Sequence, residues 1–299
     1  MVKIELKNYF KTIKGKTVLK DITVNFESGK IYKLNGPNGC GKTMLLRAIT
    51  GLIYPTKGKL KVNDTIVSFG KDYPVKLGVL IETPIFWKEY TGFDVLKYLA
   101  SIRNEITEEQ IKKNMDRVGL DWSDKRAIGK YSLGMRQKLG IASVLVDDID
   151  VLILDEPVSA LDPIGRKEVL DLIKSLKNKM TVIFSSHILV DIEKVCDDII
   201  LIHNGKILVN DSCDNLLKSS DCLLVKCASR EEILLLKDVY NAEFSSKFEN
   251  TIEVKYQDLY KIQADVLKNA KKLNVIVEKM EVKKENLEEI FLNEVINNG

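Results

Sequence analysis

One stretch of the chain has the residue types and spacing of a phosphate-binding loop. Residues 36–43 match the pattern GxxxxGK[ST], with a strand-like run before them and a helix-like run after them. Glycines let the backbone turn its N–H groups toward an anion, the lysine adds a point charge, and the last hydroxyl suits Mg²⁺. We therefore predict a site for the phosphates of ATP, in preference to a chance glycine-rich turn. The loop residues are Gly36, Pro37, Asn38, Gly39, Cys40, Gly41, Lys42 and Thr43.

A pair of acidic residues follows a second strand-like run. Asp155 and Glu156 come directly after the apolar residues 151–154. In phosphate-loop enzymes an aspartate at this place helps to hold Mg²⁺, so we predict that Asp155 does so through water. Glu156, one residue further on, is predicted to polarise the attacking water as a general base. The alternative is an acidic pair that only caps the strand at the surface.

Three further segments carry polar groups that could reach a nucleotide. YSLGMRQ occupies residues 131–137, SALD occupies residues 159–162, and His187 ends the strand-like run that begins at residue 181. Taken singly, these groups have ordinary structural explanations. Ser132 could cap a helix, and His187 could be a hydrogen-bonded histidine at a strand end. Their joint presence, in this order, favours a shared function.

In order and spacing, the motifs resemble those of the nucleotide-binding subunits of ABC transporters, over residues 1 to about 215. The resemblance implies an α/β fold of the P-loop NTPase type. It implies a mainly parallel sheet core, an antiparallel N-terminal subdomain, and a helical subdomain at about residues 84–145.

The resemblance also implies that two ATPase subunits pack head to tail and hold two ATP molecules between them. Ser132 and Gly134 of one subunit would cap the γ-phosphate that the other subunit's Lys42 holds. Asp162 would make contacts across the dimer. His187 would touch the γ-phosphate and hold the catalytic water in place. The catalytic residues implied are Lys42, Glu156 and His187.

Short apolar runs bounded by turn residues predict the strands that position these groups. A helix-like segment such as residues 164–177 lies between successive strands, and this alternation predicts a parallel sheet with helices on both faces. Ligands bind at the carboxyl ends of the strands in such sheets, where the loop and the acidic pair lie. The predicted strands are residues 31–34, 151–154, 181–184, 199–202 and 206–209, the last two joined by an Asn204-Gly205 turn.

The character of the sequence changes after about residue 215, and residues 216–299 are predicted to form an accessory α+β module. Its segments follow the order βαββαβ, which fits a ferredoxin-like module. A last amphipathic helix is predicted over residues 285–295, with Leu287, Ile290 and Phe291 on one face. The other predicted segments are strands at 222–227, near 244, at 251–256 and at 275–282, and helices at 231–239 and 258–272.

Two positions near the nucleotide depart from the family pattern. Ile13 stands where an aromatic residue usually stacks on adenine, and an apolar contact with Val18 is the simpler interpretation of it. Met44 follows Thr43 where a second hydroxyl is common, so one phosphate hydrogen bond is expected to be missing. Both positions are still expected to border the bound nucleotide.

Two polar positions also depart from the pattern. Glu82 stands where the family usually has a glutamine near Mg²⁺. Its carboxylate is expected to reach the metal or the water, and the alternative is a solvated loop residue. The signature reads YSLGM rather than LSGGQ, but Ser132 and Gly134 remain, so the contacts with the γ-phosphate are expected to survive. The catalytic set named above predicts competent hydrolysis.

Glu82, the YSLGMRQ signature and the tail at residues 285–292 together resemble one subgroup, the ATPase subunits of bacitracin- and lantibiotic-resistance exporters. In these exporters the permease is a separate integral membrane chain. Residues 82–100 would form the surface that docks a cytoplasmic helix of the permease, because aromatic side chains favour interfaces. The alternative is that they pack the helical subdomain. The residues concerned are Pro84, Phe86, Trp87 and Tyr90.

Composition limits the remaining possibilities. The 299 residues include 46 Lys+Arg and 43 Asp+Glu, a net charge of +3, and no dense basic run, so no nucleic-acid partner is expected. No apolar run reaches the roughly 18 residues of a membrane-spanning helix, and the N-terminus has no signal-peptide core. We expect a cytoplasmic protein, peripheral to the inner face of the membrane through its permease. Five scattered cysteines predict reduced structural thiols.

Two other functions stay open. A soluble ABC ATPase of translation or DNA repair would normally show two cassettes or a long coiled-coil insertion, and this sequence shows neither. A nucleotide-gated sensing subunit with little turnover would fit the variant signature and Ile13. The sequence is compatible with both a homodimer and a heterodimer.

Overall fold

The computed structural model describes residues 2–82, 84–102, 106–145, 148–159, 161–187, 195–216, 219–245, 248–284, 290 and 295–296 of the chain. The chain divides into two compact units: Met1–Cys213 makes up most of the first, and Asp214–Leu292 forms the second. Within these described ranges, no helix is both long enough and apolar enough to cross a membrane.

A six-stranded sheet forms the centre of the N-terminal unit. Its order is β10-β9-β3-β8-β7-β6, and all neighbours are parallel except the β9–β10 hairpin. Every residue of β7 and β8 is buried, as the continuous apolar sequences of a sheet covered on both faces require. The strands are β3 (Ile31–Asn35), β6 (Leu77–Leu80), β7 (Val151–Leu154), β8 (Thr181–Ser186), β9 (Asp198–His203) and β10 (Lys206–Ser212).

An antiparallel sheet at the start of the chain completes the core of this unit. Its order is β2-β1-β4-β5. Its buried side chains, such as Ile4 and Phe26, pack in one cluster with Leu45 of the first helix and with Leu34 and Ile183 of the parallel sheet. The two sheets therefore enclose the helix that follows the phosphate-binding loop. The strands are β1 (Lys3–Ile13), β2 (Lys16–Glu27), β4 (Lys57–Val62) and β5 (Thr65–Ile66).

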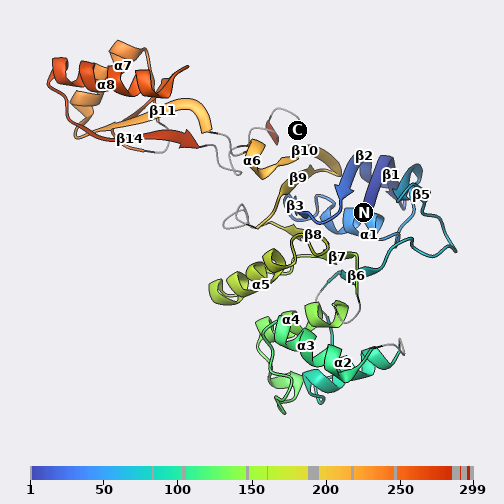
Figure 1. Ribbon diagram of the computed structural model, residues 1–299. Helices are drawn as coiled ribbons and strands as arrows, with labels where there is room; N and C mark the ends of the chain where they lie inside the picture. Colours follow the sequence, from blue (N-terminus) through green and yellow to red (C-terminus); the bar gives the residue numbers. More distant parts are fainter. Residues whose placement is uncertain are drawn as a thin grey trace. The chain divides into compact units, whose positions relative to one another are not determined.

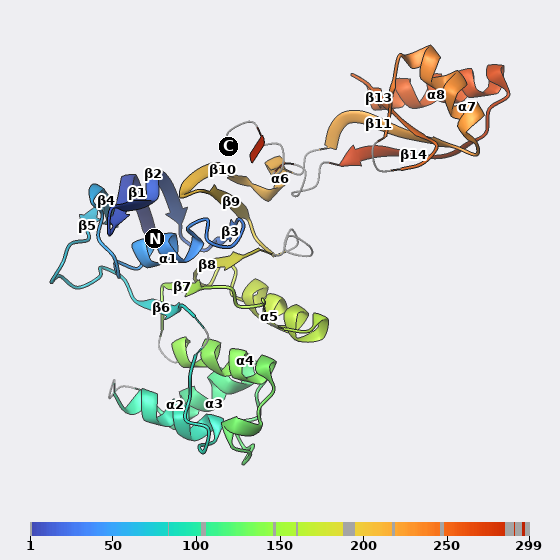
Figure 2. The same cartoon turned by 180° about the vertical axis from the view of Figure 1, so that it is seen from behind.

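Helices cover both sides of the parallel strands. Figure 1 and Figure 2 show α1 on one side and α5 on the other, with α2, α3 and α4 gathered in a separate group beside β6. Side-chain caps mark where several helices begin, among them Thr107 before α3 and Asp162 before α5. The helices are α1 (Lys42–Ile49), α2 (Gly92–Ser101), α3 (Glu108–Arg117), α4 (Leu133–Val144) and α5 (Pro163–Ser175), with a 3-10 turn at Ile128–Lys130.

The C-terminal unit is an antiparallel sheet with two helices on one face. The strand order in the sheet is β12-β13-β11-β14, and the chain order βαββαβ agrees with the order predicted from the sequence. Alternate residues of β11, Leu223 and Val225, share a core with Ile233 of α7 and Val266 of α8. The elements are α6 (Cys213–Leu216), β11 (Ser219–Cys227), α7 (Arg230–Tyr240), β12 (Glu243–Phe244), β13 (Thr251–Lys255), α8 (Leu259–Leu273) and β14 (Val277–Lys284).

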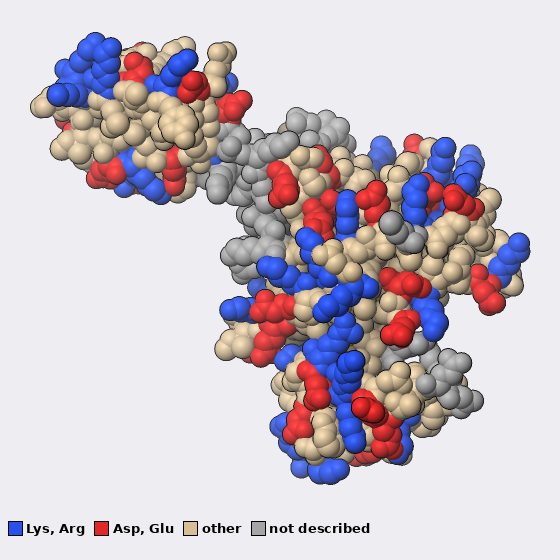
Figure 3. Space-filling view, viewed as in Figure 1, with Lys and Arg blue, Asp and Glu red and all other residues tan. Residues whose placement is uncertain are grey.

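The predicted α/β class with a mainly parallel sheet is confirmed. The predicted helix over residues 285–295 falls largely outside the described residues, and so do Leu287 and Phe291. Figure 3 shows acidic and basic side chains interspersed on the face that it draws. This mixture agrees with the near balance of charge in the sequence.

Candidate functional site

The phosphate-binding loop lies between the carboxyl end of β3 and the first turn of α1. Gly36, Gly39 and Gly41 have φ values of 155°, 77° and 117°, which glycine adopts more readily than other residues. A Cβ on Gly36 would lie 2.2 Å from the carbonyl oxygen of Ile202, so no side chain fits there. The loop backbone can therefore turn sharply into the helix, as an anion-binding loop requires.

Lys42 closes this loop from within. Its side chain is almost fully buried, and its Nζ donates hydrogen bonds to the carbonyl oxygens of Gly36 at 2.8 Å and Pro37 at 3.2 Å. The same Nζ lies 3.3 Å from Oε1 of Glu156. The ammonium group thus points into the loop and toward the predicted catalytic carboxylate.

Asp155 lies between two hydroxyl groups. Thr43 Oγ1 of α1 donates to its Oδ2 at 2.6 Å, and the Ser185 hydroxyl of β8 donates to its Oδ1. Carboxylate and hydroxyl oxygens are hard donors of the kind that Mg²⁺ prefers. The residues present therefore fit a magnesium ion at the junction of α1 and β7.

Glu156 lies between Lys42 and His187. Its backbone has a φ of 47°, and its N–H donates to Ser185 Oγ at 2.7 Å. Its Oε2 is 2.9 Å from His187 Nδ1. Its buried Oε1 has no partner with hydrogen-bond geometry, although the lysine is 3.3 Å away. One carboxylate oxygen thus contacts the histidine, and the other faces the lysine ammonium.

Sheet topology explains why these groups meet. β3, β8 and β7 are adjacent parallel strands, so their carboxyl ends lie at one edge of the sheet. The structure therefore brings together five of the residues predicted from the sequence, which are Lys42, Thr43, Asp155, Glu156 and His187.

A second group of predicted residues lines a hollow of about 380 Å³. Ser132 caps α4 by accepting from the N–H of Met135 at 3.1 Å, and Asp162 caps α5 by accepting from the N–H of Gly165 at 2.7 Å. Gly134 lies on the same wall, and no residue of the phosphate-binding loop takes part in the lining. The signature and the loop thus lie at separate places on this chain.

Three other predicted residues, Ile13, Met44 and Cys40, have structural surroundings that the fold explains. Ile13 ends β1, pairs with Lys16 across a hairpin, and is 38% exposed. Met44 is partly buried and packs against the core cluster. The Cys40 thiol is buried inside the loop, and burial raises its pKa. Met44 and Cys40 therefore help to hold the loop to the core.

Glu82 has a partner of its own. Its Oε1 accepts a hydrogen bond from Arg47 Nη2 at 2.7 Å, its side chain is largely exposed, and its φ is 74°. Arg47 lies one turn beyond Thr43 on α1, so it occupies the same side of that helix. In this structure the carboxylate is directed to the arginine.

Ser185 and Arg47 were missed by reasoning from the sequence. Ser185 contacts both members of the acidic pair. Its position at the end of a buried strand could have revealed it, because strand ends in parallel sheets face the ligand. For Arg47, the helical spacing of four residues from Thr43 was the available signal.

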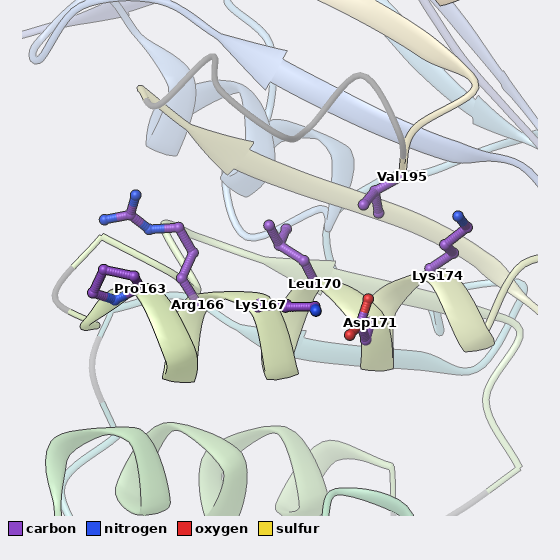
Figure 4. Close-up of a pocket in the computed structure, with 7 residues that line it drawn as sticks. All are labelled: Pro163, Arg166, Lys167, Leu170, Asp171, Lys174 and Val195. Atoms are coloured by element: carbon purple, nitrogen blue, oxygen red, sulfur yellow. The ribbon is translucent and has the colours of Figure 1, made fainter.

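A different hollow, of about 390 Å³, lies on α5 (Figure 4). Arg166, Leu170 and Lys174 project from the helix toward the segment that carries Val195. The other lining residues are Pro163, Lys167 and Asp171. None of these belongs to the predicted site, so the shape of this hollow does not locate the chemistry.

Comparison with known proteins shows which family the chain belongs to. The family model described as ABC transporter matches residues 19–159. The lantibiotic transport ATP-binding protein SrtF of Streptococcus pyogenes is 36% identical over 216 residues, which are 71% of this chain and 91% of that protein. The chain belongs to the family of ABC transporter ATP-binding proteins. The bacitracin transport ATP-binding protein BcrA of Enterococcus faecalis is 35% identical, over 72% of this chain and 71% of that protein.

Other members and solved structures extend the likeness. The ABC transporter ATP-binding protein YcbN of Bacillus subtilis, which is uncharacterized, is 31% identical over 97% of this chain and 95% of its own. The structure of cbiO1 from Clostridium perfringens has a TM-score of 0.64 at 20% identity, over 71% of this chain and 89% of that chain. The ATP-binding cassette MJ0796, a dimer bound to ADP and Pi, has a TM-score of 0.62 at 20% identity, over 70% of this chain and 98% of that chain. These structures show that this ABC chain has the ATP-binding cassette fold.

Proposed function

We propose that this chain is an ATP-hydrolysing subunit that powers an ABC transporter. The contact of Glu156 with both Lys42 and His187 carries the proposal. This contact supports a site in which Lys42 binds phosphate, Glu156 is the base for water and His187 holds that base. Membership of the ABC family supports ATP as the nucleotide.

Binding of ATP begins at the loop. The backbone N–H groups of residues 36–43 and the Lys42 ammonium bind the β- and γ-phosphates, and the lysine exchanges its two loop carbonyls for phosphate oxygens. Thr43 and Asp155 would hold Mg²⁺, which would neutralise charge on the phosphates. Glu82 would join the metal only by leaving Arg47.

Hydrolysis then uses the acidic residue between the lysine and the histidine. Water attacks the γ-phosphorus, the bond to the oxygen of the ADP leaving group breaks, and Glu156 takes the proton of the water. His187 holds the other oxygen of this carboxylate, so that Oε1 faces the water. ADP and inorganic phosphate are the products.

A second subunit completes each site. The hollow at Ser132 and Gly134 is separate from the loop, which supports an arrangement in which one subunit's signature closes on the other's γ-phosphate. The positive end of α4 lies at this signature and favours an anion. Asp162, in the same hollow, makes contacts across the dimer. The second subunit is a copy of this chain or a related ATPase subunit.

The membrane partner is a separate permease. The names of SrtF and BcrA support an exporter of lantibiotic or bacitracin type, and hence a position on the inner face of the membrane through that permease. Residues 82–100 form its docking surface. The ATPase domain covers residues 1–215, with its helical subdomain at about 84–145, and residues 216–299 form the accessory module.

A steady-state ATPase assay of the full chain tests this function, with Glu156→Gln as the comparison. We expect hydrolysis by the parent and a fall of roughly 10²–10⁴-fold in the variant, because a general base contributes about that factor. Equal, very slow turnover by both would contradict the enzyme. Recovery of the chain from its cells without any integral membrane protein would contradict the transporter.

A further inference from the structure

An exposed group of rings lies on the helical part of the N-terminal unit. Trp87, Tyr90 and Tyr98, here called the aromatic patch, are 50%, 54% and 55% exposed. The Trp87 ring is 5.0 Å from that of Tyr98 and 6.0 Å from that of Tyr90. The patch belongs to the proposed docking surface for the permease.

Main-chain hydrogen bonds join the aromatic patch to the segment that precedes the signature. The N–H of Gly129 donates to the carbonyl oxygen of Lys88 at 2.9 Å, and the N–H of Ile128 donates to that of Tyr90 at 2.8 Å. Thr91 continues this pairing as an isolated antiparallel bridge. A displacement of residues 87–91 therefore has to move the neighbouring segment or break these bonds.

Tyr131 extends the connection up to Ser132. Its side chain is buried, and its phenol oxygen lies close against Gly92, the first residue of α2. The approach is so close that a Cβ on Gly92 would lie 2.9 Å from that oxygen. The carbonyl oxygen of Tyr131 accepts from Arg136 Nη1 at 2.6 Å, within α4. The leucine of the usual LSGGQ signature could not make the phenol contact.

We propose that Tyr131 is a positioning residue that couples the aromatic patch to Ser132. Its phenol packs against the start of α2, and its main chain leads directly into Ser132. Closure on ATP and movement at the patch therefore affect each other. Coupling of this kind is reciprocal, and each site must therefore respond to a ligand at the other. The inference rests on the proposed function, since it requires Ser132 to close on ATP in a dimer.

Reciprocity allows a test without the permease. The chain has two tryptophans, so Trp122→Phe leaves Trp87 as the only tryptophan in the full-length protein, and its emission is excited selectively at wavelengths that tyrosine does not absorb. In that background Glu156→Gln is added to prevent hydrolysis. Trp87 emission is recorded with and without ATP and Mg²⁺, and sedimentation reports the dimer. The comparison is between Tyr131→Phe and the matched control Tyr73→Phe.

The control removes a phenol that donates to the backbone of Ile49 at 2.6 Å, away from the signature. We expect ATP to shift Trp87 emission in the parent and in Tyr73→Phe. We expect Tyr131→Phe, measured at concentrations where it is fully dimeric, to lose most of that shift. Thermal unfolding verifies that each variant is folded.

A full emission shift in dimeric Tyr131→Phe would overturn the coupling. A parent that dimerises with no shift in Trp87 emission would overturn it as well. A folded Tyr131→Phe that never dimerises would also overturn it, because the tyrosine would then be needed to build the site itself. If the parent forms no dimer with ATP, the proposed function fails, and the coupling falls with it.

Discussion

At the scale of single residues, Ser185 connects the two carboxylates of the site. It is fully buried, its hydroxyl donates to Asp155, and the same oxygen accepts from the N–H of Glu156. Glu156 is held in a left-handed backbone conformation that a non-glycine residue seldom adopts. The serine therefore fixes both the aspartate that is proposed to hold Mg²⁺ and the backbone of the proposed base.

Ser185→Ala is expected to lower kcat by roughly 10- to 100-fold, because a hydrogen bond to a charged group is worth about 1.5–3 kcal/mol. Ser175→Ala is the matched control, since its hydroxyl donates to the backbone of Leu172 on α5. The measurement is steady-state ATP hydrolysis as a function of the Mg²⁺ concentration. Unchanged kinetics in Ser185→Ala would show that the serine is not required.

The cysteines give a second prediction at this scale. All five are buried, and burial raises the pKa of Cys40 and Cys222 and raises that of Cys227 to about 11. A thiol with a raised pKa stays protonated, and therefore unreactive, when the pH is well below that pKa. At pH 8 we expect a chromogenic disulfide reagent to modify none of them until denaturant is added. Rapid stoichiometric reaction of the native chain would contradict this burial.

At the scale of elements, the turn into α1 depends on one glycine. Gly36 combines a positive φ with the carbonyl of Ile202 where a Cβ would have to be. The clash is with backbone, which cannot rotate away. The geometry of the loop is thus set by the neighbouring strand β9 as well as by its own sequence.

Gly36→Ala is expected to abolish binding of a fluorescent ATP analogue. The control is Gly15→Ala, at a hairpin where φ is also positive (79°) but nothing lies within 4 Å of the added Cβ. We expect Gly15→Ala to lose about 1 kcal/mol of stability from the unfavourable φ and to keep its nucleotide affinity. Normal binding of the ATP analogue by Gly36→Ala would show that the loop can shift to make room for the added Cβ.

The elements were largely predictable because strong apolar runs and turn residues mark them. Residues 151–154 form β7 as predicted, and both residues of the Asn204-Gly205 turn have positive φ. The proximity of Lys42 to the acidic pair was predictable because both follow the carboxyl ends of parallel strands. The Arg47–Glu82 pair could not be foreseen, because it joins a helix to a loop whose path no local pattern specifies.

At the scale of the whole molecule, the two units have separate cores. Leu45, Leu34 and Phe26 belong to the first, whereas Leu236 and Val266 belong to the second. Every residue of the proposed site precedes the boundary at Cys213. Stability in the second unit and nucleotide binding in the first are therefore expected to be independent.

Leu236→Ala is expected to destabilise the C-terminal unit by about 2–5 kcal/mol, the usual effect of a cavity in a buried core. The control Leu235→Ala removes a neighbour that is 48% exposed and should have little effect. Hydrogen exchange measured peptide by peptide separates the two units, and a titration gives the affinity for ATP. A loss of affinity in Leu236→Ala would show that the cores are coupled.

The 3.3 Å approach of Lys42 to Glu156 also has a consequence for the binding of ATP. The carboxylate acts as a resident counter-ion in the place where the γ-phosphate will bring its own negative charge. When ATP binds, its γ-phosphate replaces the Glu156 carboxylate beside Lys42. Glu156 becomes free to act on the water only after this replacement. Glu156→Gln should therefore bind ATP more tightly than the parent as well as hydrolyse it more slowly, a difference that calorimetry can measure. The same carboxylate is thus the partner that ATP displaces from Lys42 and, once displaced, the base that serves the reaction.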